Sequence, residues 1–355
     1  MRILLAFSIV LSASLNVLCQ DCAQTLRLAR ATYEQGRLHE IEGQLKTCLE
    51  SGFTKDQNQL KVEAYRILCL SYIYLEEPEK ADDTMLKLKL TDPYYEPNPA
   101  VDPAEFVALY NTFRKDPVYR VGITLGGNFS QPNVKELVTV TELSGDSEFK
   151  RSFAIQFGGA IDVPLNIFKT RGKWTLHGEL LYQQRRYEID QKETTTNPID
   201  GSERVNEFEG IESQSALVLP VALQYKFLDK DRLNPFIGFG IAPELMFGRK
   251  MTAEKIRGNQ PSVPEKGEDL AHQTFNLSAI VSTGVKIPMR PGFIVVELRY
   301  AHGLTNITTE DDAYANQALA LDYTFADSIF KMSSLSISAS YIFDKFSPKK
   351  LKRKS

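Results

Sequence analysis

The sequence predicts an α+β multidomain protein: an N-terminal all-α, repeat-like helical domain followed by an eight-stranded antiparallel transmembrane β-barrel. Two observations carry this prediction. Apolar residues recur at helical spacing up to about residue 115, and from residue 118 they alternate with a period of two. The alternating segments are joined by connections that are long and short in strict turn, as in barrels of the outer membrane.

The expected domain boundaries follow these changes of pattern. We expect a signal peptide over residues 1–19, a tetratricopeptide-like helical domain over 20–93, a linker with a docking helix over 94–116, the barrel over 117–346 and a basic tail over 347–355. The formal net charge of −3 gives no reason to expect nucleic acid as a partner. Beyond the first residues no run of about 18 apolar residues occurs, so membrane-spanning helices are not predicted.

The first residues predict export. Arg2 supplies a positive start, and residues 3–15 are apolar but too short to span a bilayer. Cleavage after Cys19 would leave Gln20 as the first mature residue. The alternative is a lipoprotein signal in which Cys19 is acylated, and Leu18 argues against it because small residues normally stand at that position.

The helical domain is predicted as two hairpins of helices. The helices are expected over residues 23–35, 38–49, 57–75 and from Pro78 to about residue 91. The hairpins resemble tetratricopeptide repeats in residues 33–38, Ala64, Tyr65, Tyr72, Lys80, Ala81, Asp92 and Pro93. Because they are spaced wider than the usual period of about 34 residues, a generic helical bundle is the alternative.

Two cysteines are candidates for a disulfide. Cys22 opens the first helix and Cys48 lies near the end of the second, so an antiparallel hairpin would bring them side by side. Export permits a disulfide, and a small core benefits from one, so we expect a Cys22–Cys48 bridge. Cys69 lies on an apolar helix face and is expected to be a buried thiol.

A proline-rich connector over residues 94–99 precedes a short predicted helix with Asp102 as its N-cap. One face of this docking helix is apolar and must be covered, either by the barrel rim or by the repeat domain. The face consists of Phe106, Leu109, Tyr110 and Phe113.

Eight alternating segments are predicted as strands, at roughly 118–130, 151–164, 173–188, 214–228, 234–248, 273–287, 292–303 and 330–345. The connections around 131–150, 189–213, 249–272 and 304–329 are long, and those around 166–172, 229–233 and 288–291 are short. Outer-membrane barrels have short periplasmic turns, so the helical domain and the C-terminus are predicted to be periplasmic.

Charged residues alternate with the apolar face and are expected inside the barrel. An eight-stranded barrel is barely wide enough for its own side chains, and charge in a narrow lumen must be paired. We therefore expect a fixed salt-bridge network, with a conduction path or proton relay as the alternative. Besides His177, the network would contain Arg120, Asp162, Glu179, Arg185, Lys226, Glu244, Lys286, Glu297 and Arg299.

Several barrel segments carry a family resemblance through their order and spacing. They are residues 121–123, 126–130, 219–227, 235–240 and, most sharply, 297–307 with the sequence ELRYAHGLTNI. Together they resemble the PorT-type outer-membrane β-barrel family of Bacteroidota. The family's named member takes part in protein export through the type IX secretion system, so the resemblance implies fold, location and a role in secretion. The helical extension departs from a bare barrel.

No catalytic residue, metal site or cofactor is predicted. The four histidines show no metal-binding spacing, and the acidic run 310–312 lacks an EF-hand pattern and is expected to be a solvated loop. His302 and His272 lie at the outer ends of strands, where small barrels build active sites, but no Ser–His–Asp arrangement accompanies them.

The sequence therefore favours a non-enzymatic protein, anchored in outer-membrane lipid, whose periplasmic domain binds a protein partner in secretion or envelope assembly. One alternative is a surface receptor or adhesin acting through the long loops. The other is an outer-membrane enzyme of the lipid acyltransferase kind. The basic tail is expected to be a solvated end, with contact to anionic lipid or to a partner as the alternative.

Overall fold

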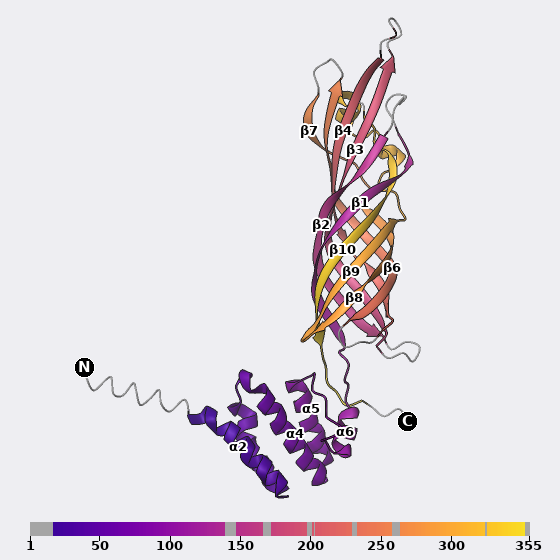
Figure 1. Ribbon diagram of the computed structural model, residues 1–355. Coiled ribbons are helices and arrows are strands. Elements are labelled where there is room, and N and C mark those ends of the chain that lie inside the picture. The colour runs from indigo at the N-terminus through magenta and orange to yellow at the C-terminus, as the bar shows by residue number, and fades with distance from the viewer. Residues whose placement is uncertain are drawn as a thin grey trace, which may run out of the picture. The chain divides into compact units, whose positions relative to one another are not determined.

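The computed structural model describes residues 17–138, 147–165, 172–196, 201, 203–228, 233–257, 263–323 and 325–351. The chain divides into two compact units: a helical unit, Met1–Pro117 with Phe346–Ser355, and a barrel unit, Val118–Lys345 (Figure 1). The predicted signal peptide falls outside the described residues up to residue 16. Among the helices described, none has both the length and the hydropathy needed to cross a membrane.

The helical unit contains two helix pairs followed by a shorter helix. Gly36, with a φ of +77°, lies just beyond the first helix, where glycine is favoured, and Pro78 occupies the first turn of the fourth. The elements are α2 (Val17–Glu34), η1 (Leu38–Glu40), α3 (Ile41–Thr47), η2 (Cys48–Gly52), η3 (Lys55–Gln57), α4 (Asn58–Tyr74), α5 (Pro78–Thr91) and α6 (Ala104–Asn111).

The apolar face of α6 is covered by the helical unit itself. Phe106, Tyr110 and Phe113 are buried in the same core as the α4 and α5 side chains, and Leu109 packs against it partly buried. The hydroxyl of Tyr110 also donates a hydrogen bond to the carbonyl of Tyr95, at 2.8 Å. Of the two expected partners of the docking face, the structure therefore has the repeat domain, because α6 completes the core of the helical unit.

Cys22 and Cys48 form a disulfide, with their Cα atoms 5.6 Å apart. It joins α2 to η2, the segment that follows α3. Cys69 is buried in α4, and burial raises the pKa of its thiol to about 12. A thiol held protonated in this way is unreactive.

One lysine interrupts the apolar core of the helical unit. Lys89 of α5 is 2% exposed, and its Nζ lies 4.0 Å from the centre of the Tyr110 ring. Within the described residues this Nζ has no hydrogen-bond partner. Burial, assisted by the positive charge of Lys115, lowers the pKa of Lys89 to about 8. The ring face supplies the cation–π contact that partly replaces hydration.

The C-terminal segment returns to the helical unit. Arg114 N donates to Lys349 O at 3.0 Å and Leu351 N donates to Thr112 O at 2.8 Å, so a short antiparallel bridge forms beyond α6. Lys350 also pairs with Asp82 of α5. Residues 349–351 are exposed, as expected of a solvated tail, but their backbone is also hydrogen-bonded to the chain segment after α6.

The barrel unit is a closed antiparallel ring of eight strand positions. The strands β4 and β5 share one position, because both pair with β3 and β6, whereas β7 pairs with β6 alone. The strands are β1 (Tyr119–Glu136), β2 (Ser147–Leu165), β3 (Trp174–Thr196), β4 (Glu203–Val218), β5 (Val221–Lys226), β6 (Asn234–Arg257), β7 (Val263–Asp269), β8 (Phe275–Met289), β9 (Gly292–Gly303) and β10 (Ile329–Lys345).

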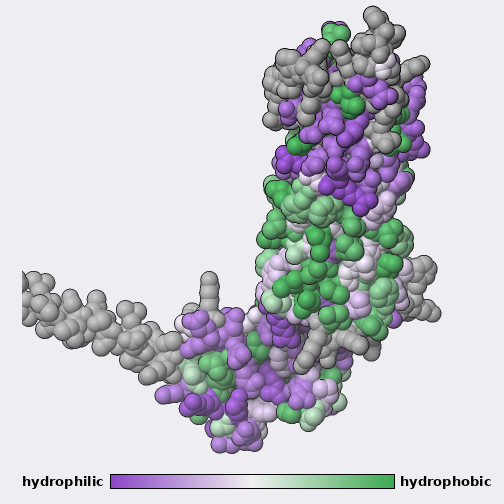
Figure 2. Space-filling model, turned by 45° about the horizontal axis from the view of Figure 1, so that its top comes forward, coloured by the Kyte–Doolittle hydropathy of each residue, from purple (hydrophilic) through white to green (hydrophobic). Residues whose placement is uncertain are grey.

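An apolar belt surrounds the part of the barrel nearest the start of β1 and the end of β10 (Figure 2). Its outward-facing side chains include Ile123, Leu125, Ile155, Ile161, Leu180, Ile237, Leu245, Val281, Leu298 and Ile337. Aromatic pairs border it: Trp174 contacts Tyr225 near one edge, and Phe157 contacts Tyr182 near the other. An apolar band between aromatic girdles is the signature of a lipid-facing barrel surface.

Beyond the belt the strands continue into what we call the distal section, formed by residues 185–196, 203–214, 249–257 and 263–269. Here the two faces exchange character. Tyr187 and Ile189 of β3 and Phe208 of β4 are buried inside, while Glu188 and Asp190 face outward. The surface of this section is hydrophilic in Figure 2.

The distal section corrects two predicted loops. Residues 189–213 and 249–272 are predicted as long connections, but residues 189–196 of β3 pair with residues 203–210 of β4, and residues 250–255 of β6 pair with residues 263–269 of β7. The fourth long connection, residues 304–328, carries η4 (Glu310–Asp312) and α7 (Gln317–Asp322) and packs into the ring. Ile307, Leu319, Tyr323 and Phe325 of this connection are buried against the inner face.

Candidate functional site

The barrel interior holds a chain of charged side chains within the apolar belt. Lys286 of β8 lies 2.9 Å from Asp162 of β2, whose second carboxylate oxygen is 2.5 Å from His177 Nδ1. The other ring nitrogen of His177 lies 3.4 Å from Glu179, the next inward residue of β3. Asp162, His177 and Glu179 are each at most 3% exposed. Four side chains from three strands thus form a continuous chain of contacts in which basic and acidic groups alternate.

The run continues across the lumen to β9. Glu179 Oε2 lies 2.5 Å from Arg299 Nη1, and Arg299 Nη2 lies 2.6 Å from Glu297 Oε1. The two carboxylates also accept hydrogen bonds from neutral side chains: Thr124 donates to Glu179 at 3.3 Å, and Gln224 donates to Glu297 at 3.3 Å. Buried charges are tolerated when they are paired and hydrogen-bonded in this way.

The remaining predicted lumen residues lie at other levels. Arg185 forms a bidentate pair with Glu244, at 2.6 and 2.5 Å. Arg120 pairs with Asp344 at 2.7 Å, a partner that the sequence did not single out. Lys226 lies half-buried on β5. The structure thus places the predicted charges in several clusters along the axis.

Among the described residues, these clusters border a small cavity in the barrel interior. A cavity of about 20 Å³ lies beside the Arg185–Glu244 pair, bordered by Gln183, Ser334 and Ser336. This volume accommodates about one water molecule. The serine face of β10, which alternates with its apolar face, lines this part of the interior.

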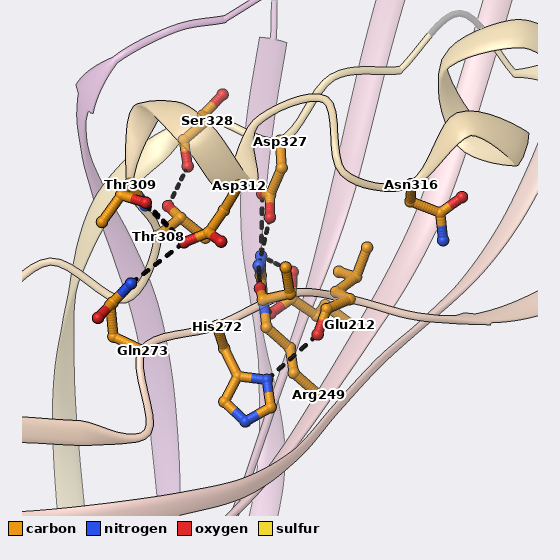
Figure 3. Close-up of polar contacts among 12 residues, drawn as sticks. Glu212, Arg249, His272, Gln273, Thr308, Thr309, Asp312, Asn316, Asp327 and Ser328 are labelled. Carbon is orange, nitrogen blue, oxygen red and sulfur yellow. Dashed lines mark hydrogen bonds and ion pairs between the residues drawn. The ribbon is translucent and has the colours of Figure 1, made fainter.

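A buried ion triad stands in the distal section (Figure 3). Arg249 of β6, 2% exposed as a whole residue, lies 2.6 and 2.8 Å from the two carboxylate oxygens of Glu212 on β4. The same guanidinium pairs with Asp327, which belongs to the connection after β9. Sequence analysis missed this triad because each member fell within a predicted loop, where charge signals solvent exposure.

The connection over the distal end is held by further polar contacts. Asp312 of η4 accepts hydrogen bonds from Thr309 Oγ1 at 2.8 Å and from Gln273 Nε2 at 3.3 Å (Figure 3). Thr308 donates to the carbonyl of Ser328 at 2.6 Å. The acidic run 310–312 therefore includes a carboxylate engaged in capping its own turn. Within the residues described, no group of His, Cys, Asp and Glu has the arrangement of a metal site.

The histidines considered for catalysis make separate contacts. His302 Nδ1 lies 3.1 Å from Ser333 Oγ across the β9–β10 pair, and Asn133 also donates to that oxygen at 2.5 Å. His272 Nδ1 lies 3.1 Å from the carbonyl of Leu270. Neither ring contacts a carboxylate among the described residues, so the third member of a triad is absent there.

The helical unit presents a second polar arrangement on one face. Arg30 of α2 lies 3.1 Å from Glu63 of α4, and Glu63 lies 3.2 Å from Arg66. Arg66 in turn lies 2.5 Å from Asp102, just before α6. We call these four residues the charge ladder. Tyr74, 50% exposed and next to Tyr33, lies at the end of α4.

Comparison with known proteins identifies the barrel. Residues 113–309 match the family described as outer membrane protein beta-barrel domain. The chain belongs to this family. It is accordingly an outer-membrane β-barrel protein, in which the family match leaves most of the helical unit uncovered.

Solved structures similar to the chain include outer-membrane proteins. Neisserial surface protein A is 11% identical, with a TM-score of 0.29 over 64% of this chain and 97% of that chain. Outer membrane protein OprG from Pseudomonas aeruginosa is 12% identical, with a TM-score of 0.31 over 64% and 98%. Ail of Yersinia pestis is 12% identical, with a TM-score of 0.27 over 63% and 99%. No curated protein matches the chain in sequence.

Proposed function

We propose that the protein is a non-enzymatic anchor of the outer membrane whose helical unit binds a protein partner in the periplasm. The observation that carries the proposal is the ion-paired interior of the barrel. Ion pairs occupy its interior, and residues 304–328 pack into its distal end. A barrel with this interior is better suited to anchoring the protein in the membrane than to conducting solutes. The surface that recognises a partner is therefore expected outside the barrel lumen.

The periplasmic position of the helical unit rests on the connections of the barrel. The β8–β9 turn at Arg290 and Pro291 and the β5–β6 connection over residues 227–233 are short, and both lie at the end where β1 begins and β10 finishes. Short turns are periplasmic in this class of protein. The helical unit joins the barrel at Val118 and Lys345, at that same end.

The face that carries the charge ladder is the proposed partner site. It joins α2, α4 and the residue Asp102 just before α6, and these alternate along the chain with α3 and α5. Stacked helix pairs of the tetratricopeptide kind bind extended peptides on such a shared face. The half-exposed ring of Tyr74 adds an aromatic anchor of the type enriched in interface hot spots. The PorT-type resemblance supports a partner in protein secretion or envelope assembly.

The test compares two charge reversals in the full-length protein. Arg30→Glu changes the charge ladder, whereas Lys87→Glu changes an exposed lysine of α5 that pairs with its neighbour Asp83, at 2.6 Å. The side chains of Lys87 and Arg30 are 53% and 55% exposed, so neither substitution should unfold the helical unit. Chemical crosslinking in intact cells, followed by purification, should capture a periplasmic protein with the parent and with Lys87→Glu.

We expect Arg30→Glu combined with Tyr74→Ala to lower that capture at least tenfold, because truncation of an interface hot spot costs about 2 kcal/mol or more. Equal capture by all variants would refute the proposed face. Capture of no periplasmic protein by the parent would refute the proposed function itself.

A second candidate is binding at the exposed end of the barrel. The observation that favours it is the distal section, which is built from paired strands and a buried ion triad instead of unpaired loops. A rigid platform of this kind would display a binding surface outside the membrane. If cells carrying a version shortened at residues 189–213 keep the protein's full phenotype, this candidate is excluded.

A further inference from the structure

The lipid-facing surface of the barrel has a hollow of about 510 Å³. It lies over β2, β3 and β5 within the apolar belt, and the side chains at its rim include Ile161, Leu176, Leu180 and Leu219. Its floor contains two outward-facing glycines, Gly159 and Gly178, which lie on the neighbouring strands β2 and β3.

Internal packing does not require either glycine. A Cβ on Gly178 would find its nearest neighbour, Ile161 Cγ2, at 3.5 Å, and one on Gly159 would meet only Gly122 O, at 3.7 Å. Both are ordinary contact distances. Gly127, also outward-facing, differs, because a Cβ there would lie 2.2 Å from the ring of Phe153. The chain therefore fills the gap above Gly127 with its own side chain and leaves the gap above Gly159 and Gly178 open.

We propose that this hollow binds one acyl chain of a phospholipid. The belt of an outer-membrane barrel is surrounded by hydrocarbon, and the rim of the hollow is apolar, so a flexible hydrocarbon chain is the occupant that matches both. An unfilled hollow would forfeit the dispersion contacts of its lining. A second copy of the chain fits less well, because a two-fold contact would set hollow against hollow.

The position of the hollow also fits a lipid. Leu176 and Gly178 lie two and four residues from Trp174, which contacts Tyr225 at the aromatic edge of the belt. At about 3.3 Å per residue, the hollow begins roughly 7 Å from that edge. A phospholipid with its headgroup level with the aromatic rings would thus extend its acyl chain along β3 into the hollow.

The single tryptophan of the chain, Trp174, makes the binding measurable without a label. The purified full-length protein in detergent micelles is titrated with phosphatidylcholine brominated on its acyl chains, because bromine quenches indole fluorescence on contact. The test variant is Gly159→Leu with Gly178→Leu, which fills the hollow. The control is Val281→Leu on β8, which enlarges an exposed apolar side chain elsewhere on the belt.

We expect half-maximal quenching of the parent and of Val281→Leu at the same lipid-to-protein ratio, and a ratio at least fivefold higher for the filled variant. Folding is verified by the heat-dependent mobility of the barrel, and Gly178→Ala replaces the double variant if that one fails to fold, with a smaller shift expected in the same direction. Superimposable quenching curves for all folded variants would overturn the proposal. A filled variant that quenches like the parent but loses a dimer in sedimentation would also overturn it, in favour of contact with a second copy.

Discussion

The apolar belt and the distal section are two parts of one ring of strands with opposite distributions of polarity. In the belt, β3 places Leu176 and Leu180 outside and His177 and Glu179 inside. Ten residues further along the same strand, Tyr187 and Ile189 are inside and Glu188 is outside. The backbone alternation continues without interruption, so only the surrounding medium has changed. The comparison shows that each face of the strand is matched locally to lipid, to water or to a protein core.

The largest expected effect concerns the core of the distal section. Arg249→Met removes the guanidinium that neutralises Glu212 and Asp327 and leaves two carboxylates in a buried site. We expect a loss of about 3–5 kcal/mol in the free energy of unfolding, as for other broken buried ion pairs. Urea unfolding in lipid vesicles measures it.

The matched control is Lys192→Met, which breaks the exposed Lys192–Glu207 pair of the β3–β4 hairpin and should cost no more than about 1 kcal/mol. Similar losses for the two variants would contradict the view that the distal section has an interior of its own.

A smaller effect separates the outer faces of the two sections. Ile123 of β1 is 70% exposed on the belt, and Ile211 of β4 is 39% exposed on the distal section. Ile123→Lys should destabilise the folded barrel in vesicles by about 2–4 kcal/mol if it lies near the middle of the bilayer. Ile211→Lys should be neutral, because it faces water beside Glu188. Equal costs in the same unfolding assay would mean that the distal section is also immersed in lipid.

The smallest effect probes charge on the distal surface. Glu209 of β4 lies directly opposite Asp190 of β3 and Glu254 of β6, and like charges in cross-strand pairs are unfavourable. Glu209→Gln should therefore stabilise the barrel by about 0.2–1 kcal/mol at low ionic strength, with less gain in high salt. Glu207→Gln, two residues away, loses its partner Lys192 and should not stabilise. Stabilisation by both would point to net charge and not to pairing.

The same inversion of polarity explains what the sequence could predict. The eight strand positions, the inward charges of the belt and the disulfide pair depend on local alternation and spacing, which a single sequence displays. The two hairpins of the distal section were predicted as loops because residues 203–213 are mostly polar on the face that lipid would contact. The triad of Glu212, Arg249 and Asp327 joins residues from three such segments. Its burial depends on how residues 304–328 fold back, and no local pattern specifies that.

The helical unit shows a related limit. A lysine in an amphipathic helix is normally expected on the solvent-facing side, yet Lys89 is buried beneath the ring of Tyr110 on α6. The docking face of α6 was recognised from its spacing, but its two possible partners were equivalent on sequence grounds. Choosing between them required the packing of Phe106 and Phe113 into the helical core.

The return of residues 349–351 to the segment after α6 has a consequence for the order of events in biogenesis. The helical unit is made of the first and the last parts of the chain, with all of the barrel strands between them. Its edge at Thr112 and Arg114 therefore stays open until β10 has been synthesised and exported. Closure of that edge therefore comes after synthesis of the barrel strands, and a chain interrupted before residue 349 would lack the partners that Thr112 and Arg114 use there.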